Sequence, residues 1–190
     1  MSSFLNCRIE IIIGPMFSGK STELMRRCSR EEVIGKNVLY INHSFDTRTG
    51  DFIQTHSSHC KNALKLSSLD LIPEKDFNEA NVIGIDEAQF FPDLYEFVLK
   101  CEEKSKTVIM SGLDGDSNRK PFGKILDCIP LCDSVIKLTA MDMIDKNGTE
   151  AIFSLRIKNT QSTQEQICIG AQDTYMAVSR KNYLDNTYGF

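Results

Sequence analysis

The chain has 190 residues, of which 41% are hydrophobic and 25% are charged, and its formal net charge is −4. This is the balance of a globular protein with its own core, and the negative charge argues against nucleic acid as its main partner. The longest apolar run, around residues 9–14, is too short to span a membrane, and residues 1–10 lack the pattern of a secretory signal. Seven cysteines without a C-x-x-C pair are typical of a reducing compartment. We therefore expect a cytoplasmic protein that binds neither nucleic acid nor membrane.

Short apolar runs alternate with amphipathic stretches over the first two-thirds of the chain. The pattern predicts strands over 8–13, 37–42, 81–86, 106–111 and 134–139, and helices over 20–34 and 93–103. Strands that alternate with helices imply right-handed crossovers and a mainly parallel sheet. We therefore predict an α/β domain over residues 1–139, with helices on the faces of the sheet.

Two segments depart from this alternation. Residues 47–61 are polar and are typical of a mobile loop or a hairpin. From residue 140 onward, Asn147-Gly148 suits a two-residue hairpin turn, and residues 150–157 and 175–183 are predicted strands around a polar loop over 159–166. We predict that residues 140–190 form a second, small β-rich domain.

A phosphate-binding motif follows the first predicted strand. Gly14 and Gly19 allow the backbone to curl until several N–H groups point at one phosphate, while Lys20 supplies a cation. Ser21 offers a hydroxyl to Mg²⁺, and the helix that begins here adds its positive N-terminal end. The motif fits G-x-x-x-x-G-K-[ST] in full: Gly14, Pro15, Met16, Phe17, Ser18, Gly19, Lys20 and Ser21. The sequence therefore predicts a P-loop α/β fold that binds a nucleoside triphosphate with Mg²⁺.

Two carboxylates end the third predicted strand. Asp86 closes an apolar run, the position at which P-loop proteins hold Mg²⁺. Glu87 comes next and would face the cleft at the carboxyl ends of the strands, where a carboxylate can accept the proton of an attacking hydroxyl. A solvated glutamate that caps the following helix is the alternative. The spacing alone does not separate hydrolysis from phosphoryl transfer.

Other charged residues lie near predicted strand ends. Asp46 and Arg48 are two residues apart after the second strand, so both would point into the cleft, where Arg48 can bridge phosphoryl oxygens. A surface ion pair is the other interpretation. Arg119 and Lys120 form a weaker candidate of the same kind. The three histidines show no ligand spacing.

Several motifs, taken together and in order, resemble the type II thymidine kinases, the small tetrameric class. The phosphate loop with the helix start, Gly-Pro-Met-Phe-Ser-Gly-Lys-Ser-Thr-Glu-Leu, is similar to that family's loop almost residue for residue. The similarity covers about residues 5–185. The matching segments are 14–24, 46–48, 55–56, 83–92, 112–115, 119–123 and 137–140.

This resemblance implies roles for individual residues. Glu87 would be the general base, Lys20, Ser21 and Asp86 would serve ATP and Mg²⁺, and Asp46 and Arg48 would hold the reacting phosphate region. Backbone groups of about residues 157–170 would read the base in a lasso-like loop. The family also implies a homotetramer that thymidine triphosphate inhibits as end product. The pocket for the base would be lined by Met16, Phe90, Leu113, Phe122 and Tyr175.

The sequence departs from the family pattern in three places. The family binds a structural zinc with two C-x-x-C pairs, and these positions align here with Asp142, Asp145, Ser179 and Asn182. Such oxygen and amide groups are poor ligands for structural zinc, so we predict a degenerate zinc-ribbon-like appendage without the metal. Ser117 stands where the family has an aromatic residue, which leaves room for other deoxynucleosides. Ala88 after the glutamate is a milder change.

The leading hypothesis is a thymidine kinase that transfers the γ-phosphoryl of ATP to the 5′-hydroxyl of thymidine in nucleotide salvage, for DNA precursor synthesis. We expect deoxyuridine to be accepted as well. A deoxynucleoside kinase of broader specificity is the alternative among enzymes. From another class, a non-catalytic nucleotide-binding regulatory module remains open, although the presence of Lys20, Ser21, Asp86 and Glu87 together argues against it.

Overall fold

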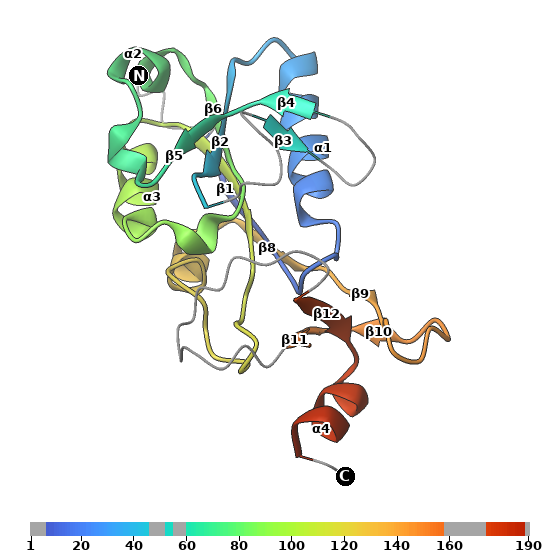
Figure 1. Ribbon diagram of the computed structural model, residues 1–190. Coiled ribbons are helices and arrows are strands. Elements are labelled where there is room, and N and C mark those ends of the chain that lie inside the picture. Colours follow the sequence, from blue (N-terminus) through green and yellow to red (C-terminus); the bar gives the residue numbers. More distant parts are fainter. Residues whose placement is uncertain (1–6, 46–51, 55–59, 158–173, 189–190) are drawn as a thin grey trace.

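A six-stranded parallel sheet forms the centre of the protein in the computed structural model, which describes residues 7–45, 52–54, 60–157 and 174–188 (Figure 1). The strand order is β5-β2-β6-β7-β1-β8. The strands are β1 (Ile9–Ile13), β2 (Val38–His43), β5 (Leu64–Leu66), β6 (Val82–Ile85), β7 (Thr107–Gly112) and β8 (Ser134–Lys137). The helices that flank them are α1 (Lys20–Val33), α2 (Glu74–Glu79) and α3 (Leu94–Glu103). The predicted α/β class is confirmed, and the predicted strands and helices appear with ends shifted by one or two residues.

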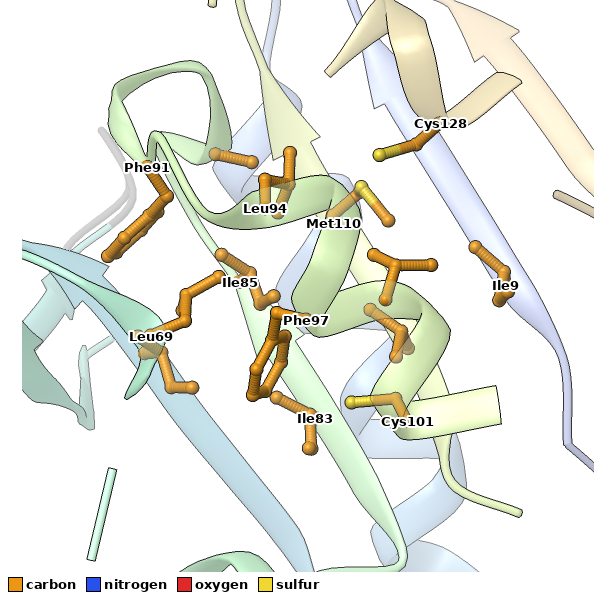
Figure 2. Packing of buried hydrophobic residues seen from close by; sticks show 14 of the residues in the cluster. Ile9, Leu69, Ile83, Ile85, Phe91, Leu94, Phe97, Cys101, Met110 and Cys128 are labelled. Atoms are coloured by element: carbon orange, nitrogen blue, oxygen red, sulfur yellow. The ribbon is translucent and has the colours of Figure 1, made fainter. Parts of the chain in front are cut away.

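The central strands β1, β6 and β7 are buried on both faces, as expected for parallel strands between helices. Successive residues of a strand point to opposite faces, so Ile11 and Ile13 of β1 join the cluster under α3. Ile12 points the other way and joins Leu24 of α1 in a second cluster. Figure 2 shows the first cluster, in which Leu94, Phe97 and Cys101 of α3 pack with Ile83, Ile85 and Met110 of the sheet.

The parallel arrangement brings the carboxyl ends of the strands to one edge of the sheet. β1 pairs with β7, which in turn pairs with β6, so the segments that follow these three strands are neighbours. They are the phosphate loop after Ile13, the 3-10 helix η2 (Ala88–Phe90) after Asp86 and Glu87, and the chain that leaves β7 at Gly112. This edge is where open α/β sheets bind their ligands.

A small β-rich unit follows the sheet, as predicted, and lies below it in Figure 1. Three alanines, Ala140, Ala151 and Ala177, form its buried cluster, against which Phe17 of the phosphate loop packs. The unit therefore touches the phosphate loop directly. It consists of the pairs β9 (Ala140–Met141) with β10 (Glu150–Ala151) and β11 (Phe153–Arg156) with β12 (Tyr175–Val178), and ends in α4 (Arg180–Tyr188).

Three details of the prediction for this unit were wrong. The strand expected over residues 150–157 is divided at Ile152 into β10 and β11, which belong to different strand pairs. The strand expected over residues 175–183 ends at Val178 and is followed by helix α4. Asn147-Gly148 does not form a two-residue turn, because β9 and β10 pair through Met141 and Glu150 and the connection runs from 142 to 149. Within that connection the side chain of Asn147 accepts hydrogen bonds from Thr149.

The remaining elements are short. β3 (Phe52–Gln54) and β4 (Cys60–Asn62) pair antiparallel, which agrees with the hairpin interpretation of this region. The 3-10 helices η1 (Leu69–Leu71) and η3 (Leu126–Leu131) lie before α2 and β8. Over the described parts of the chain, the helices are all too short or too polar to cross a membrane.

Candidate active site

The phosphate loop adopts the conformation that its glycines permit. Gly14 has φ +149°, and a Cβ atom there would lie 2.5 Å from the carbonyl oxygen of Leu138, so no larger residue fits. Gly19 takes a left-handed φ of 82° and begins helix α1. Lys20 bends back onto the loop, where its Nζ donates to the carbonyl oxygen of Pro15 at 2.7 Å. The cation is thus held at the loop that it is expected to serve.

Asp86 is buried at the end of β6 and is only 4% exposed. Its Oδ1 accepts hydrogen bonds from Ser111 Oγ at 2.5 Å and from the backbone N–H of Glu87 at 3.0 Å, and its carboxylate also bonds to the side chain of Ser21. Burial, followed by the nearby charge of Glu87, raises the pKa of Asp86 to about 6 despite these bonds. A carboxylate and a hydroxyl are hard oxygen ligands and fit Mg²⁺.

Glu87 follows Asp86 with a left-handed backbone, φ 52° and ψ 39°. This conformation is uncommon for residues other than glycine, costs about 1 kcal/mol or more, and occurs preferentially at functional sites. The side chain is half-buried, and its Oε2 accepts a hydrogen bond of 2.7 Å from Nε2 of Gln89. The turn therefore directs a carboxylate to the edge where the phosphate loop lies.

An aromatic cluster adjoins this turn. Phe90 contacts Phe122 edge-on, with ring centroids 5.4 Å apart, and Phe45 at 5.8 Å. His43, at the end of β2, lies 5.4 Å from Phe90 and is buried, which lowers its pKa and favours the neutral ring. Two predicted pocket residues are thus in contact, and Phe45 and His43 join them.

The other predicted pocket residues come from different elements. The backbone N–H of Leu113 donates to Gln89 Oε1 at 3.0 Å, so Leu113 is tied to the turn that carries Glu87. The backbone N–H of Met16 donates to Ser154 Oγ of β11 at 3.0 Å. Tyr175 lies on β12, opposite Arg156. Asp46 and Arg48, predicted to hold the reacting phosphate, fall outside the described residues.

The weaker basic candidate takes part in packing between the two units. The guanidinium of Arg119 lies over the ring of Tyr183 at 4.6 Å and over that of Phe153 at 5.6 Å. Tyr183 Oη also donates to the backbone oxygen of Ser117 at 2.7 Å. Ser117, which stands in place of an aromatic residue, is therefore held through its backbone by the C-terminal helix.

The four positions aligned with the family's zinc ligands lie together. Asp142 is 2% exposed, and its carboxylate accepts hydrogen bonds from the backbone N–H groups of Ile144, Asp145 and Ser179 and from the amide of Asn182. Burial by itself would raise the pKa of Asp142, but the bonds from the backbone of Ser179 and Asp145 hold it well below its usual value. The predicted absence of zinc stays a prediction.

Sequence reasoning missed Gln89, Ser111 and Ser154. Gln89 and Ser111 are fully enclosed and bond to Glu87 and Asp86, while Ser154 holds the phosphate loop. The available signal was a polar residue inside an otherwise apolar stretch, since Ser111 interrupts the run of β7. Such a residue needs a partner when buried, but the partner is not readable from spacing.

The fold and this site define a P-loop nucleotide-binding protein with a carboxylate placed beside the phosphate loop. A family model described as thymidine kinase matches residues 7–183. The chain is 46% identical over 184 residues to thymidine kinase a of Arabidopsis thaliana, covering 94% of this chain and 75% of that protein. It is 44% identical over 178 residues to the thymidine kinase of Vaccinia virus (strain Western Reserve), covering 94% and 97%. The chain therefore belongs to the thymidine kinase family.

Proposed function

We propose that this protein transfers the γ-phosphoryl group of ATP to the 5′-hydroxyl of thymidine, with Glu87 as the general base. The observation that supports this most is the turn after β6, which buries Asp86 and directs Glu87 to the ligand edge through a left-handed backbone. A protein that only binds nucleotide has no need of a second, strained carboxylate there. Family membership supports the choice of thymidine and ATP as substrates.

The positions of the phosphate-binding residues support the following roles. Residues 14–21 bind the triphosphate through backbone N–H groups, and Lys20 leaves the carbonyl of Pro15 to meet the β- and γ-phosphates. Ser21 and Asp86 hold Mg²⁺, which neutralises charge on the phosphates when bound. Glu87 then accepts the proton of the 5′-hydroxyl as that oxygen attacks the γ-phosphorus, the bond from this phosphorus to the β,γ-bridging oxygen breaks, and ADP leaves.

The base of the nucleoside is placed against the aromatic cluster. Phe90 and Phe122 form apolar walls, and Met16, Leu113 and Tyr175 complete the pocket in our proposal. We expect deoxyuridine to be accepted, because it differs from thymidine by one methyl group and such a group in an apolar pocket changes binding by only about 1–3 kcal/mol. Ser117 stands where the family has an aromatic residue, so it leaves more space beside the base. Other deoxynucleosides are therefore a second class of candidate substrates.

Further features are proposed from the resemblance and the local geometry. Asp46 and Arg48 hold the reacting phosphate region, and the protein is a cytoplasmic homotetramer that thymidine triphosphate inhibits. It is divided at about residue 139 into a P-loop domain and a zinc-free appendage. The Asp142 cluster supports this last point, because its hydrogen bonds link the two halves of the appendage without a metal.

The test is an assay of thymidine monophosphate formation from thymidine, ATP and Mg²⁺. We expect turnover by the native protein and a loss of about 10²–10⁴-fold in kcat for Glu87→Gln, the range for removal of a general base. Glu102→Gln on the exposed side of α3 is the matched control. Absence of product with the native protein would favour the alternative hypothesis of a non-catalytic regulatory module. Full activity of Glu87→Gln would refute the assignment of Glu87 as the general base.

A nucleoside panel and metal analysis on the same sample address the remaining points. Thymidine and deoxyuridine are expected to be phosphorylated most efficiently, and equal rates with deoxycytidine or purine deoxynucleosides would favour the broader kinase. We expect zinc far below one atom per chain. A stoichiometric zinc content would overturn the proposal of a metal-free appendage.

A further inference from the structure

Gln89 links the residue proposed as general base to the chain that leaves β7. It is the second residue of η2, is 3% exposed, and lies between Glu87 and Leu113. We propose that Gln89 is a positioning residue, which aims the carboxylate of Glu87 at the substrate hydroxyl and ties this aim to the nucleoside pocket through Leu113. The inference rests on the proposed function of Glu87.

The two ends of the carboxamide make different bonds. Its Nε2 donates to Glu87 Oε2 at 2.7 Å, and its Oε1 accepts from the backbone N–H of Leu113 at 3.0 Å. The orientation of the amide is fixed by chemistry, because the N–H of Leu113 can only donate and the carboxylate of Glu87 accepts. A neutral side chain that donates at one end and accepts at the other is therefore what this place requires.

Two glycines make room for Gln89. A Cβ atom on Gly112, the last residue of β7, would lie 2.5 Å from Gln89 Oε1. A Cβ atom on Gly123 would lie 1.9 Å from the backbone oxygen of Gln89. Both distances are too short for any side chain to be accommodated without displacing Gln89. The surroundings thus hold this residue in place from the carboxamide side and from the backbone side.

A positioning role has a physical reason. Glu87 has a flexible side chain at the boundary with solvent, and a general base acts only when its oxygen lies within hydrogen-bond reach of the proton it accepts. The bond from Gln89 removes part of that freedom before the substrate arrives. Misplacement of a reacting group by about 1 Å costs on the order of 10²-fold in rate, so the loss of Gln89 should appear in kcat.

The test compares two variants of nearly the same size in the native full-length chain. Gln89→Met loses both hydrogen bonds, and we expect kcat to fall about 10–100-fold while the KM for thymidine rises severalfold. Gln89→Glu keeps an oxygen for the N–H of Leu113 but places a second carboxylate against Glu87. It should lose kcat at least as strongly while the KM for thymidine stays close to that of the native protein. A merely structural role would not produce this split between kcat and KM.

A steric pair of variants tests the same idea without changing residue 89. The methyl group of Gly112→Ala would clash with Gln89 Oε1. The methyl group of Gly84→Ala in β6 would lie 2.8 Å from Cys28 Sγ, and this variant is the control because it causes a similar clash in the same sheet away from Gln89. We expect Gly112→Ala to lower kcat about tenfold at a thermal midpoint similar to that of Gly84→Ala. Equal kcat values for the two variants would contradict a role of this niche in catalysis.

The outcomes separate the inference from the function on which it rests. If Glu87→Gln loses turnover while Gln89→Met and Gln89→Glu retain kcat within about threefold, Gln89 is not a positioning residue although the base is assigned correctly. If Glu87→Gln retains turnover, the proposed base is wrong whatever the Gln89 variants do. If both Gln89 variants lose kcat and KM changes equally in the two, Gln89 is structural only.

Discussion

Two buried aspartates, one in each unit of the protein, show opposite uses of a hidden carboxylate. Asp86 at the end of β6 is 4% exposed, and Asp142 after β9 is 2% exposed. Asp86 accepts bonds from two hydroxyls and one backbone N–H, and its pKa rises to about 6. Asp142 accepts from three backbone N–H groups and an amide, and its pKa lies well below the usual value.

The difference teaches that burial alone does not tell what a carboxylate is for. Enough N–H donors replace the lost water and turn Asp142 into the centre of a closed network, which holds the segment after β9 to the start of α4. Too few donors leave the charge of Asp86 incompletely stabilised, and a bound cation is the natural completion. We therefore expect the ionised Asp142 to stabilise the fold and the ionised Asp86 to destabilise it when no ligand is bound.

In the comparison of the two aspartates, the largest expected effect is on catalysis by Asp86→Asn. Loss of the carboxylate proposed to hold Mg²⁺ should lower kcat by about 10²–10³-fold, because a metal contributes several kcal/mol to the transition state. The same change should raise the free energy of unfolding without ligand by about 1–3 kcal/mol, since the neutral amide is cheaper to bury. Steady-state assays and urea unfolding measure the two effects.

The control for Asp86→Asn is Asp70→Asn, an exposed residue that should change neither quantity. Loss of activity together with lower stability would show that Asp86 is a structural residue like Asp142. The comparison between the two aspartates would then break down.

The same chemical change at the other aspartate should act in the opposite direction. Asp142→Asn weakens the bonds to the backbone N–H groups of Ile144, Asp145 and Ser179, and we expect a loss of about 2–4 kcal/mol in the free energy of unfolding. Urea unfolding in parallel with Asp86→Asn measures it. An Asp142→Asn protein of unchanged stability would mean that the network is incidental.

The pH dependence of stability sharpens the comparison further. Asp86 binds its proton more tightly in the folded protein than in the unfolded chain. The destabilisation that its buried charge causes is therefore absent below about pH 4 and complete above about pH 6. Asp142 binds its proton less tightly when folded, so its contribution is present above about pH 4 and is lost as the pH falls. We would measure the free energy of unfolding without ligand from about pH 3.5 to 8 for the native protein and for each Asp→Asn variant. The difference between variant and native protein should have opposite signs for Asp86→Asn and Asp142→Asn, and should reach about 1–3 kcal/mol at the highest pH.

The smallest expected effect concerns the contact between the two units. Ser154→Ala removes the acceptor for the backbone N–H of Met16 in the phosphate loop. A hydrogen bond of this kind contributes about 1 kcal/mol, so the KM for ATP should rise about fivefold with little change in kcat. Ser134→Ala on the exposed edge strand β8 is the control. An unchanged KM would mean that the appendage touches the loop without supporting it.

Much of the sheet and part of the site were predictable because they depend on local patterns. The strands β1, β6 and β7 are mostly apolar, as is typical of buried parallel strands, and the motif at 14–21 specifies its own loop and helix. The place of Asp86 and Glu87 at the ligand-binding edge of the sheet could be predicted because they follow an apolar run. Each of these inferences uses residues close together in the sequence.

What could not be predicted depends on distant partners. Asp142 and Asn182 are 40 residues apart, and Gln89 meets Leu113 across 24 residues, so no periodicity signals either pair. The strand predicted over 175–183 includes the first residues of helix α4, because the polar sequence of this helix has no clear amphipathic face. The Asn-Gly pair suggested a tight turn, but the carboxylate of Asp142 organises a longer connection there.

The left-handed backbone of Glu87 also constrains which substitutions a lineage can accumulate. Glycine or asparagine would relax that turn by about 1 kcal/mol, so a copy released from selection for turnover would gain stability by losing the glutamate. β-Branched residues would be strained at this position still more than glutamate is. Glutamate at φ 52° therefore costs the fold stability that glycine or asparagine would recover, and only the use of its carboxylate offsets that cost.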